Sequence, residues 1–369
     1  MIKYLDKDLE KAQLEYRTVA VVLFAVAILT LCARMFVGIL PDMPDLAIDA
    51  IFTTIVQILL FLLMPFLVYK FVLKKNVGEI AEFSSVKKIK WHYIVIAALV
   101  GVCAYIVTIG ISTIWQTILI ATGYTHSSSA TVYPSVFNPW IFLAEMVLTA
   151  VLPAICEEFL IRGGTLSVMR GSFGYVAVLM IMGVIFGLFH QNVTQVFYTA
   201  CFGTLMAFLT IKLDSIFPAV VIHFVNNGLN VFFGYADAYK WPFFGGWFDA
   251  INSGLTNNPT AVLGVFVLVV FIGIGLVTLM MYMKTREKLA KQKEVILDAA
   301  FDQTNKRVVM MGEENKKFVE QIGMQKQIYG KSYVPDALYK PTVRDNAFMF
   351  GALAVTALST VATYVWGLF

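Results

Sequence analysis

The sequence predicts an all-α, polytopic membrane protein with about nine transmembrane helices. The chain has 369 residues, of which 59% are hydrophobic and only 14% are charged, and its mean hydropathy is +0.76. A soluble globular protein carries roughly 25% charged residues because water covers its whole surface. Composition therefore excludes an ordinary soluble enzyme. The 14% aromatic content excludes a disordered chain, since such chains are poor in apolar side chains.

About nine apolar runs come close to the length of about 20 residues that a helix needs to cross the hydrocarbon core of a bilayer. The fifth, sixth and seventh runs follow one another with almost no connection, and the longest polar stretch separates the eighth run from the ninth. We predict the spans at residues 18–40, 48–73, 94–121, 139–160, 175–190, 193–213, 216–233, 261–283 and 346–368.

These runs divide the chain into five regions. They are a three-span N-terminal region at 1–133, a four-span core at 134–233, a loop with the eighth span at 234–283, a polar segment at 284–344 and the last span at 345–369. The polar segment mixes acidic and basic residues and is predicted to form one or two amphipathic cytoplasmic helices. It is either a solvated connector or a docking site for a cytoplasmic or membrane protein partner.

Basic residues are concentrated in alternate connections, which predicts the orientation of the chain. They precede the first span and follow the second, fourth, sixth and eighth, whereas the connections at 41–47, 122–138 and 234–260 contain only Lys240. Because cytoplasmic loops carry an excess of lysine and arginine, we predict a cytoplasmic N-terminus and an external C-terminus. An odd number of spans agrees with this. We expect a multi-pass protein of a cell membrane, with a bacterial plasma membrane favoured.

Three further features narrow the class of protein. The net charge of +4 is spread over several loops, so no nucleic-acid partner is expected. The N-terminal segment leads into a run too long for a cleaved signal peptide, so we expect a mature end. Four cysteines lie in apolar runs without CxxC spacing and are predicted to be buried free thiols: Cys32, Cys103, Cys156 and Cys201.

Charged residues inside apolar helices cost at least a few kcal/mol each, so they tend to mark functional sites. The fourth span ends with Glu157, Glu158 and Arg162. Residues four apart share a helix face, so Glu158 and Arg162 are predicted to form an ion pair. Glu157 points about 100° away, and two carboxylates in different environments are a recurrent acid–base arrangement. Alternatively, both glutamates simply lie at the headgroup boundary beside Arg162.

Two of the four histidines lie in apolar helices. His190 follows Phe186 by four residues and His223 precedes Asn227 by four, so each pair shares a helix face. A single histidine in such a helix is usually satisfied by a neighbouring carbonyl, but two histidines, an asparagine and a glutamate pair within one region indicate a polar site. Two glycines near His190 allow a neighbouring helix to approach closely: Gly183 and Gly187.

Together these residues resemble the signature of the CAAX-protease and bacteriocin-processing (CPBP/Abi) family of intramembrane endopeptidases. The resemblance covers residues 134–233 and implies that the first glutamate and both histidines are essential. It also implies substrates such as prenylated C-termini, secretion leaders or peptide pheromones. The motifs are EExxxR (Glu157, Glu158, Arg162), FxxxH (Phe186, His190) and HxxxN (His223, Asn227), in that order.

Hydrolysis of a peptide bond needs an activated water, a group that polarises the carbonyl and a proton donor for the leaving amine. We predict that Glu157 is the general base and that His190 positions the water or moves its proton. Glu158 and Arg162 would fix the end of the helix. His223 and Asn227 are the candidates for hydrogen bonds to the oxyanion.

A metal-dependent mechanism is the alternative to this metal-free one. Glu157, His190 and His223 are a His₂Glu set of the kind that holds catalytic zinc with one open position. The HExxH pair of common zinc proteases is absent from the sequence, so the metal-free mechanism is favoured and no cofactor is expected.

The depths of the motifs make a further prediction about the fourth span. Glu157 and His190 meet only if that span starts later, if it continues past Gly163 and Gly164, or if the helices tilt. We then expect the three motifs to line one cavity.

Two charged residues in spans outside the motifs, Arg34 and Glu145, are predicted to have structural roles. The competing functions are a non-proteolytic scaffold or immunity protein of the same fold and, less favoured, a small-molecule transporter.

Overall fold

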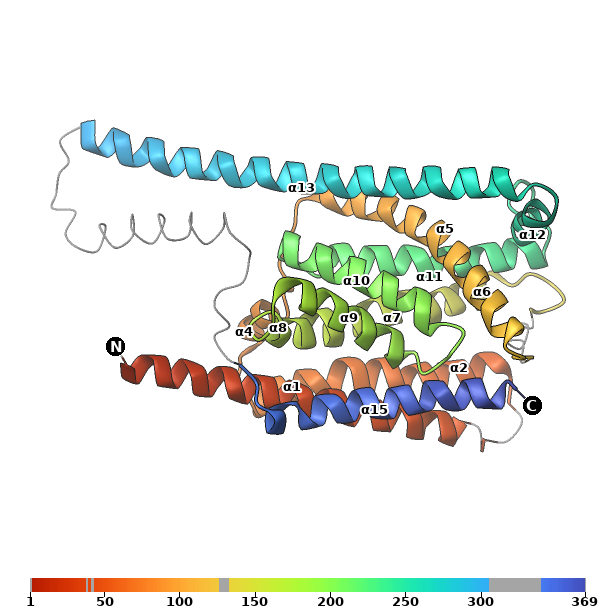
Figure 1. Cartoon of the computed structure of the whole chain (residues 1–369), viewed down its shortest axis with the longest axis horizontal. Helices are drawn as coiled ribbons and strands as arrows, with labels where there is room; N and C mark the ends of the chain where they lie inside the picture. Colours follow the sequence, from red (N-terminus) through yellow and green to blue (C-terminus); the bar gives the residue numbers. More distant parts are fainter. Residues whose placement is uncertain (1, 38, 41–42, 126–132, 305–339, 369) are drawn as a thin grey trace.

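A computed structural model describes residues 2–37, 39–40, 43–125, 133–304 and 340–368. Within these ranges the secondary structure is helical, with no β-strand (Figure 1). Eight of the helices are long and apolar enough to cross a membrane, which confirms the all-α polytopic fold. Most of the predicted polar segment, residues 305–339, lies outside the described residues.

Six passes are single helices, and two are composite. The single helices are α1 (Ile2–Val37), α5 (Trp91–Ala121), α10 (Val196–Leu213), α11 (Phe217–Ala238), α13 (Pro259–Thr304) and α15 (Val343–Trp366). One composite pass contains α2 (Asp45–Thr53), η1 (Thr54–Leu63) and α3 (Met64–Phe71). The other contains α6 (Pro139–Glu145), η2 (Met146–Val151), α7 (Leu152–Glu158), η3 (Phe159–Thr165) and α8 (Leu166–Met169). The fifth predicted span is the shorter α9 (Tyr175–Phe189), and the connections contain α4 (Val77–Phe83) and α12 (Trp247–Asn257).

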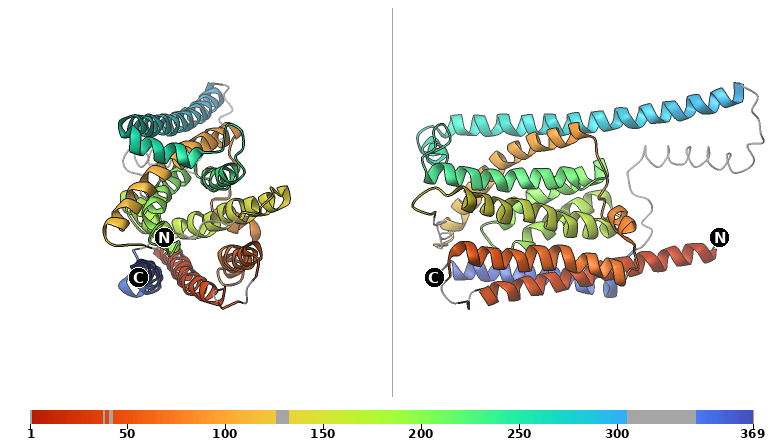
Figure 2. Two further views of the ribbon diagram at one scale, coloured as in Figure 1. Left: turned by 90° about the vertical axis from the view of Figure 1, so that its right-hand side faces the viewer. Right: turned by 180° about the vertical axis from the view of Figure 1, so that it is seen from behind.

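The passes lie side by side along one axis of the body. The helices α1 and α15 and the α2–α3 pass form one side, α5 and α13 form the other, and α7, α9 and α10 lie between them (Figures 1 and 2). The N-terminus and the far end of α13 project from one end of the body, whereas α12 and the C-terminus lie at the opposite end. The apolar helix α9, with 15 residues, is shorter than the eight helices that are long enough to cross a membrane.

Both composite passes contain π-helical turns, and two of these turns precede a proline. Pro65 follows η1, and Pro153 follows η2. Proline has no N–H, and its ring clashes with the carbonyl four residues earlier, so a widened turn relieves the clash. The third stretch, η3, carries the pass through Gly163 and Gly164 into α8, which is one of the three alternatives that the sequence left open. Gly164 is needed there because a Cβ would lie 2.9 Å from the Cζ of Tyr69.

The predicted close approach at the α9 glycines is confirmed. A Cβ at Gly187 would lie 2.5 Å from the carbonyl oxygen of Val196, and one at Gly183 would lie 2.7 Å from that of Ala200. Only glycine allows α10 to pack this closely against α9. The approach fixes the position of the C-terminal turn of α9, from which the FxxxH motif projects.

The loop between α9 and α10 is tied to the first and last helices of the body. Gln191 is fully buried and has a φ of 47°, which is uncommon outside glycine. Its Nε2 donates to the carbonyl of Ala27 in α1 (3.2 Å), and its Oε1 accepts from the hydroxyl of Ser359 in α15 (3.2 Å). The Val193 N–H donates to the hydroxyl of Thr363, also in α15 (2.9 Å). These bonds stabilise a backbone conformation that would otherwise be unfavourable.

The same two helices are joined again near the start of α15. Asp345 is buried and closes a capping box with Thr342. It also pairs with Arg17 of α1 at 2.5 Å. Tyr16 donates to the side chain of Asn346. The last helix is therefore connected to the first at two places, through Gln191 and near the start of α15.

The prediction that all four cysteines are buried is wrong for three of them. All are free thiols, but only Cys156 is buried; Cys103 is half-buried, and Cys32 and Cys201 are exposed on the helical body. In a membrane protein an apolar helix face can point to lipid as well as to the interior. An apolar run therefore does not by itself imply burial.

Candidate active site

A buried polar network joins the first and third motifs. Arg162 Nη1 donates to Glu158 Oε1 at 2.9 Å, which confirms the predicted ion pair. The same carboxylate oxygen lies 2.9 Å from Nδ1 of His223 in α11. Glu158 and Arg162 have no exposed surface, and His223 is 3% exposed. Charges this deeply buried are tolerated only when they are paired.

The guanidinium of Arg162 is also enclosed from two other sides. Its Nη2 donates to the carbonyl of Gly203 in α10 at 3.2 Å, and its Cζ lies 4.1 Å from the ring centroid of Phe186 in α9. Such a cation–π contact is strengthened where water is excluded. Arg162 therefore holds three neighbouring helices, α7, α9 and α10, around one point.

Phe186 separates the two histidines of the motifs. Its ring centroid lies 5.0 Å from that of His190 and 5.6 Å from that of His223. Because Phe186 is itself buried, it forms an apolar wall between the network of Glu158 and the side chain of His190. The FxxxH motif thus supplies both the aromatic ring that separates the two polar regions, Phe186, and a polar side chain, His190.

Glu157 and His190 line a second polar environment, a small cavity of about 90 Å³. Gln57 of η1 donates its Nε2 hydrogen to Glu157 Oε1 at 2.8 Å. His190 Nδ1 lies 2.8 Å from the carbonyl oxygen of Phe186. A carbonyl only accepts hydrogen bonds, so Nδ1 carries the proton and a neutral ring leaves Nε2 as an acceptor. Adjacent glutamates therefore do lie in different environments.

Part of this cavity comes from residues that the sequence analysis did not assign to the site. Arg34 and Thr30 of α1, Gln57 of η1 and Gln195 beside α10 all line it. Arg34 Nη2 donates to the backbone carbonyl of His190 at 3.0 Å. The charge of Arg34 in an apolar span was a visible signal, but its sequence distance from the motifs gave no reason to join it to them.

The third motif lies behind the cavity rather than on it. His223 is hydrogen-bonded to Glu158, and Asn227 donates its Nδ2 hydrogen to the carbonyl of Thr149 at 3.1 Å. That carbonyl is four residues before Pro153, which has no N–H to donate to it. The expectation that all three motifs line one cavity is therefore correct for the first two motifs only.

No three histidine, cysteine, aspartate or glutamate side chains among the described residues are placed to hold a metal ion. In the predicted His₂Glu set, Glu157 contacts Gln57, and His223 contacts Glu158. The side chains as arranged do not fit a shared ion. The metal-free mechanism stays a prediction, and zinc stays its alternative.

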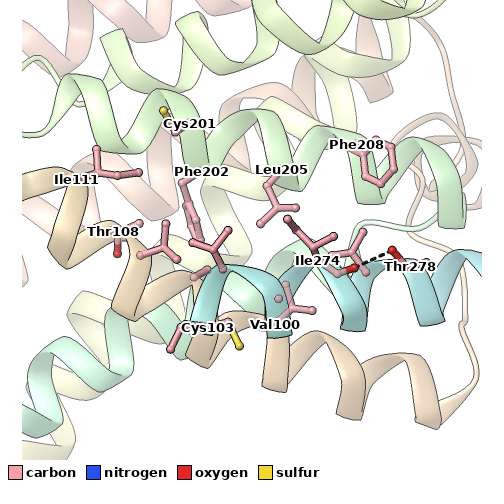
Figure 3. A pocket seen from close by; sticks show the side chains of 16 residues that line it. Val100, Cys103, Thr108, Ile111, Cys201, Phe202, Leu205, Phe208, Ile274 and Thr278 are labelled. Carbon is pink, nitrogen blue, oxygen red and sulfur yellow. Dashed lines mark hydrogen bonds between the residues drawn. The ribbon is translucent and has the colours of Figure 1, made fainter. Parts of the chain in front are cut away.

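A larger apolar cavity of about 370 Å³ lies between α5, α10 and α13 (Figure 3). Phe202 lines it, and the ring of Phe202 also lies 6.1 Å from that of His223. Thr108 lines it as well and donates to Asn226, which donates in turn to Asn227. Its lining contains neither a carboxylate nor a histidine. It adjoins the back of the third motif but supplies no acid–base group.

Comparison with known families agrees with the motifs. Residues 139–229, which contain all three motifs, match the family model described as Rce1-like, type II CAAX prenyl endopeptidase. Comparison with curated proteins gives no significant match, and comparison with solved structures gives none either. The family match supports a protease within a multi-pass membrane protein. Residues 139–229 are thus similar to the Rce1-like family of type II CAAX prenyl endopeptidases.

Proposed function

We propose that the protein is an intramembrane endopeptidase that hydrolyses a peptide bond at or in the bilayer, with Glu157 as the general base. The observation that best supports this role is that Glu157 and His190 line one cavity. Glu158, in contrast, is buried and hydrogen-bonded to Arg162 and His223. Of the two adjacent carboxylates, Glu157 is the one with access to a reacting water.

In this mechanism Glu157 removes a proton from water, and the water oxygen attacks the carbonyl carbon of the substrate. His190 accepts a hydrogen bond from the same water at Nε2 and orients it. When the tetrahedral intermediate collapses, the C–N bond breaks and the proton held by Glu157 passes to the leaving nitrogen. The products are a carboxylic acid and an amine, so atoms and charge balance.

The third motif then has a positioning role. Glu158 holds His223 through Nδ1, and Asn227 joins α11 to the turn before Pro153. These bonds favour fixing the α7 helix that carries Glu157 over direct contact with the oxyanion. Arg162 supports the same helix through Glu158.

The proposed substrate is a peptide or protein in the membrane, and a prenylated CAAX C-terminus is the first class to test, because the matched family is named for it. The polar segment at 284–344 is a proposed docking site for a cytoplasmic or membrane protein. We propose no cofactor, with zinc as the alternative. The proposed location is the plasma membrane of a bacterium.

The test compares protein termini in membranes that contain the wild-type protein or Glu157→Gln. We expect new termini with the wild type that disappear with Glu157→Gln and with His190→Ala. A rate loss of about 100-fold or more is expected from removal of a general base. Glu145→Gln is the matched control, because Glu145 lies in the same composite pass but outside the cavity. Identical termini with the wild type and a folded Glu157→Gln would instead support a non-proteolytic scaffold.

The metal alternative is tested with the same assay on purified protein. Activity should survive treatment with a chelator. Loss of cleavage after chelation, restored by added zinc, would overturn the metal-free mechanism.

A further inference from the structure

The cavity of Glu157 and His190 has a side that lies outside the matched family segment. Thr30 and Arg34 are four residues apart on α1, so they share a helix face, and both line the cavity. Gln57 of η1 lies on the cavity as well. These three residues precede residue 139, where the family match begins. Half of the residues that line the cavity therefore lie outside the matched segment.

Two polar atoms on this side are buried without a hydrogen-bond partner among the described residues. They are the hydroxyl oxygen of Thr30 and the Oε1 of Gln57. Helical threonines elsewhere in the chain donate to the carbonyl four residues earlier, as Thr204 and Thr210 do, but Thr30 does not. A buried polar group without a partner is energetically unfavourable. A donor at Thr30 and an acceptor at Gln57 match the C=O and N–H of a peptide unit.

Arg34 lies at the open edge of the same cavity. Its side chain is exposed, whereas Thr30, one turn earlier, is 3% exposed. One of its N–H groups donates to the carbonyl of His190, and its Cζ lies 5.6 Å from the ring centroid of Phe52. Arg34 is in none of the ion pairs found among the residues that the structure describes. A guanidinium has five N–H donors in a planar fork, so most of them are available to a ligand.

The size of the cavity limits what can enter it. Its 90 Å³ equals the liquid volume of roughly three water molecules, which is enough for about one peptide unit. The neighbouring part of a bound peptide must therefore lie at the edge, where Arg34 is. A planar guanidinium binds a carboxylate through two parallel hydrogen bonds, and a carboxylate is the anion that a peptide carries at its C-terminus or on an acidic side chain.

We propose that Arg34 is a substrate-binding residue that holds a carboxylate of the bound peptide, while Thr30 and Gln57 bind the peptide unit placed before Glu157. This inference rests on the proposed function, since it assumes a peptide in the cavity. It assigns specificity to α1 and η1, which lie outside the family motifs. It also gives Arg34 a role other than the structural one expected from the sequence.

The experiment measures binding without hydrolysis. Glu157→Gln is reconstituted in phosphatidylcholine vesicles, and the probe is a dye-labelled, farnesylated CAAX peptide with a free C-terminal carboxylate. The matched peptide is its C-terminal amide. A second pair of amidated peptides carries aspartate or asparagine next to the terminus and identifies a side-chain carboxylate as the source. The same measurements are made after adding Arg34→Gln, and Arg286→Gln serves as a control because it changes an exposed arginine that does not line the cavity.

We expect one of the carboxylate peptides to bind at least about tenfold more tightly than its neutral partner, as for one charge-assisted hydrogen bond. Arg34→Gln should remove this difference and leave the neutral peptide unchanged, Arg34→Lys should retain part of it, and Arg286→Gln should retain all of it. Equal binding within both pairs would overturn the inference. So would an equal loss for charged and neutral peptides, which would mean that Arg34 acts only through His190.

A lipid phosphate is the other anion that could reach Arg34. If Arg34→Gln changes only the response to added phosphatidylglycerol and not the difference between peptides, the inference is overturned in favour of a lipid headgroup. Failure of the proposed function has a different signature. Cleavage products independent of Glu157 would contradict the general base, but they would leave the measured carboxylate preference and its dependence on Arg34 intact.

Discussion

The ion pair between Glu158 and Arg162 is part of a three-residue network that includes His223. One oxygen of Glu158 serves both Arg162 and His223, and the other oxygen, together with the Nε of Arg162, has no partner among the described residues. The pair has no exposed surface. A buried pair contributes little net stability, but removing one partner leaves an isolated charge, which is costly.

Arg162→Met should therefore destabilise the fold by about 3–5 kcal/mol, because Glu158 would remain buried beside His223 alone. The double variant Glu158→Leu/Arg162→Met should lose less, since it removes both charges. Unfolding in mixed detergent micelles, followed by circular dichroism, measures both. If the double variant is as unstable as the single one, the cost comes from packing and not from charge.

At the residue scale, local pairing could be predicted and distant pairing could not. The spacing of four residues predicted the contact between Glu158 and Arg162, and the 100° step predicted that Glu157 would face elsewhere. The partners of these carboxylates lie 65 and 100 residues away, at His223 and Gln57. No periodicity within a single helix contains that information.

At the scale of the helix, the turn before Pro153 depends on a neighbouring element. The carbonyl of Thr149 cannot bond to residue 153, and the amide of Asn227 in α11 donates to it instead. Asn227 thereby replaces a hydrogen bond that proline removed. The HxxxN motif is in this respect part of the backbone bonding of α7.

This predicts a coupling between the two positions. Asn227→Leu should cost about 1 kcal/mol of unfolding free energy, the typical net contribution of one hydrogen bond. In a Pro153→Ala background the helix can supply its own N–H, so the cost should fall by at least about 0.5 kcal/mol. Unfolding of the four proteins of this double-mutant cycle measures it. An unchanged cost in both backgrounds would mean that the amide does not compensate for the proline.

Helix existence was easier to predict than helix shape. Apolar length alone located the eight long passes, and the continuation through Gly163 and Gly164 was one of three ways to bring two motifs to one depth. The π turns of η1, η2 and η3 were not predicted. They depend on how the carbonyls near Pro65 and Pro153 find other partners, which is a property of packing.

For the whole molecule, the arrangement of the termini supports a test of orientation. Connections rich in lysine should face the cytoplasm, and the end that holds α12 and the C-terminus should face outward (Figure 1). In a cysteine-free variant, Asn257→Cys should react with a membrane-impermeant maleimide in intact cells. Lys88→Cys should react only after lysis. The opposite pattern would reverse the proposed orientation.

Eight of the nine predicted spans, and the segment that carries the motifs, could be located at this scale, because apolar runs are read directly along the chain. The surroundings of the core could not. α1 and η1 supply Arg34, Thr30 and Gln57 to the cavity, although they precede the motifs by more than 80 residues. The apolar faces of α1 and η1 could pack against many other helices, so their packing partners are seen only in the three-dimensional structure.

The hydrogen bonds between α15 and the loop after His190 can form only late in the synthesis of the chain. The ribosome makes the chain from its N-terminus, so every residue of the proposed catalytic group is synthesised and can enter the membrane before Ser359 and Thr363 exist. Until then Gln191 has only its hydrogen bond to Ala27 of α1, and the N–H of Val193 lacks its partner in α15. The loop that follows His190 therefore gains its full set of hydrogen bonds only when the last helix has docked.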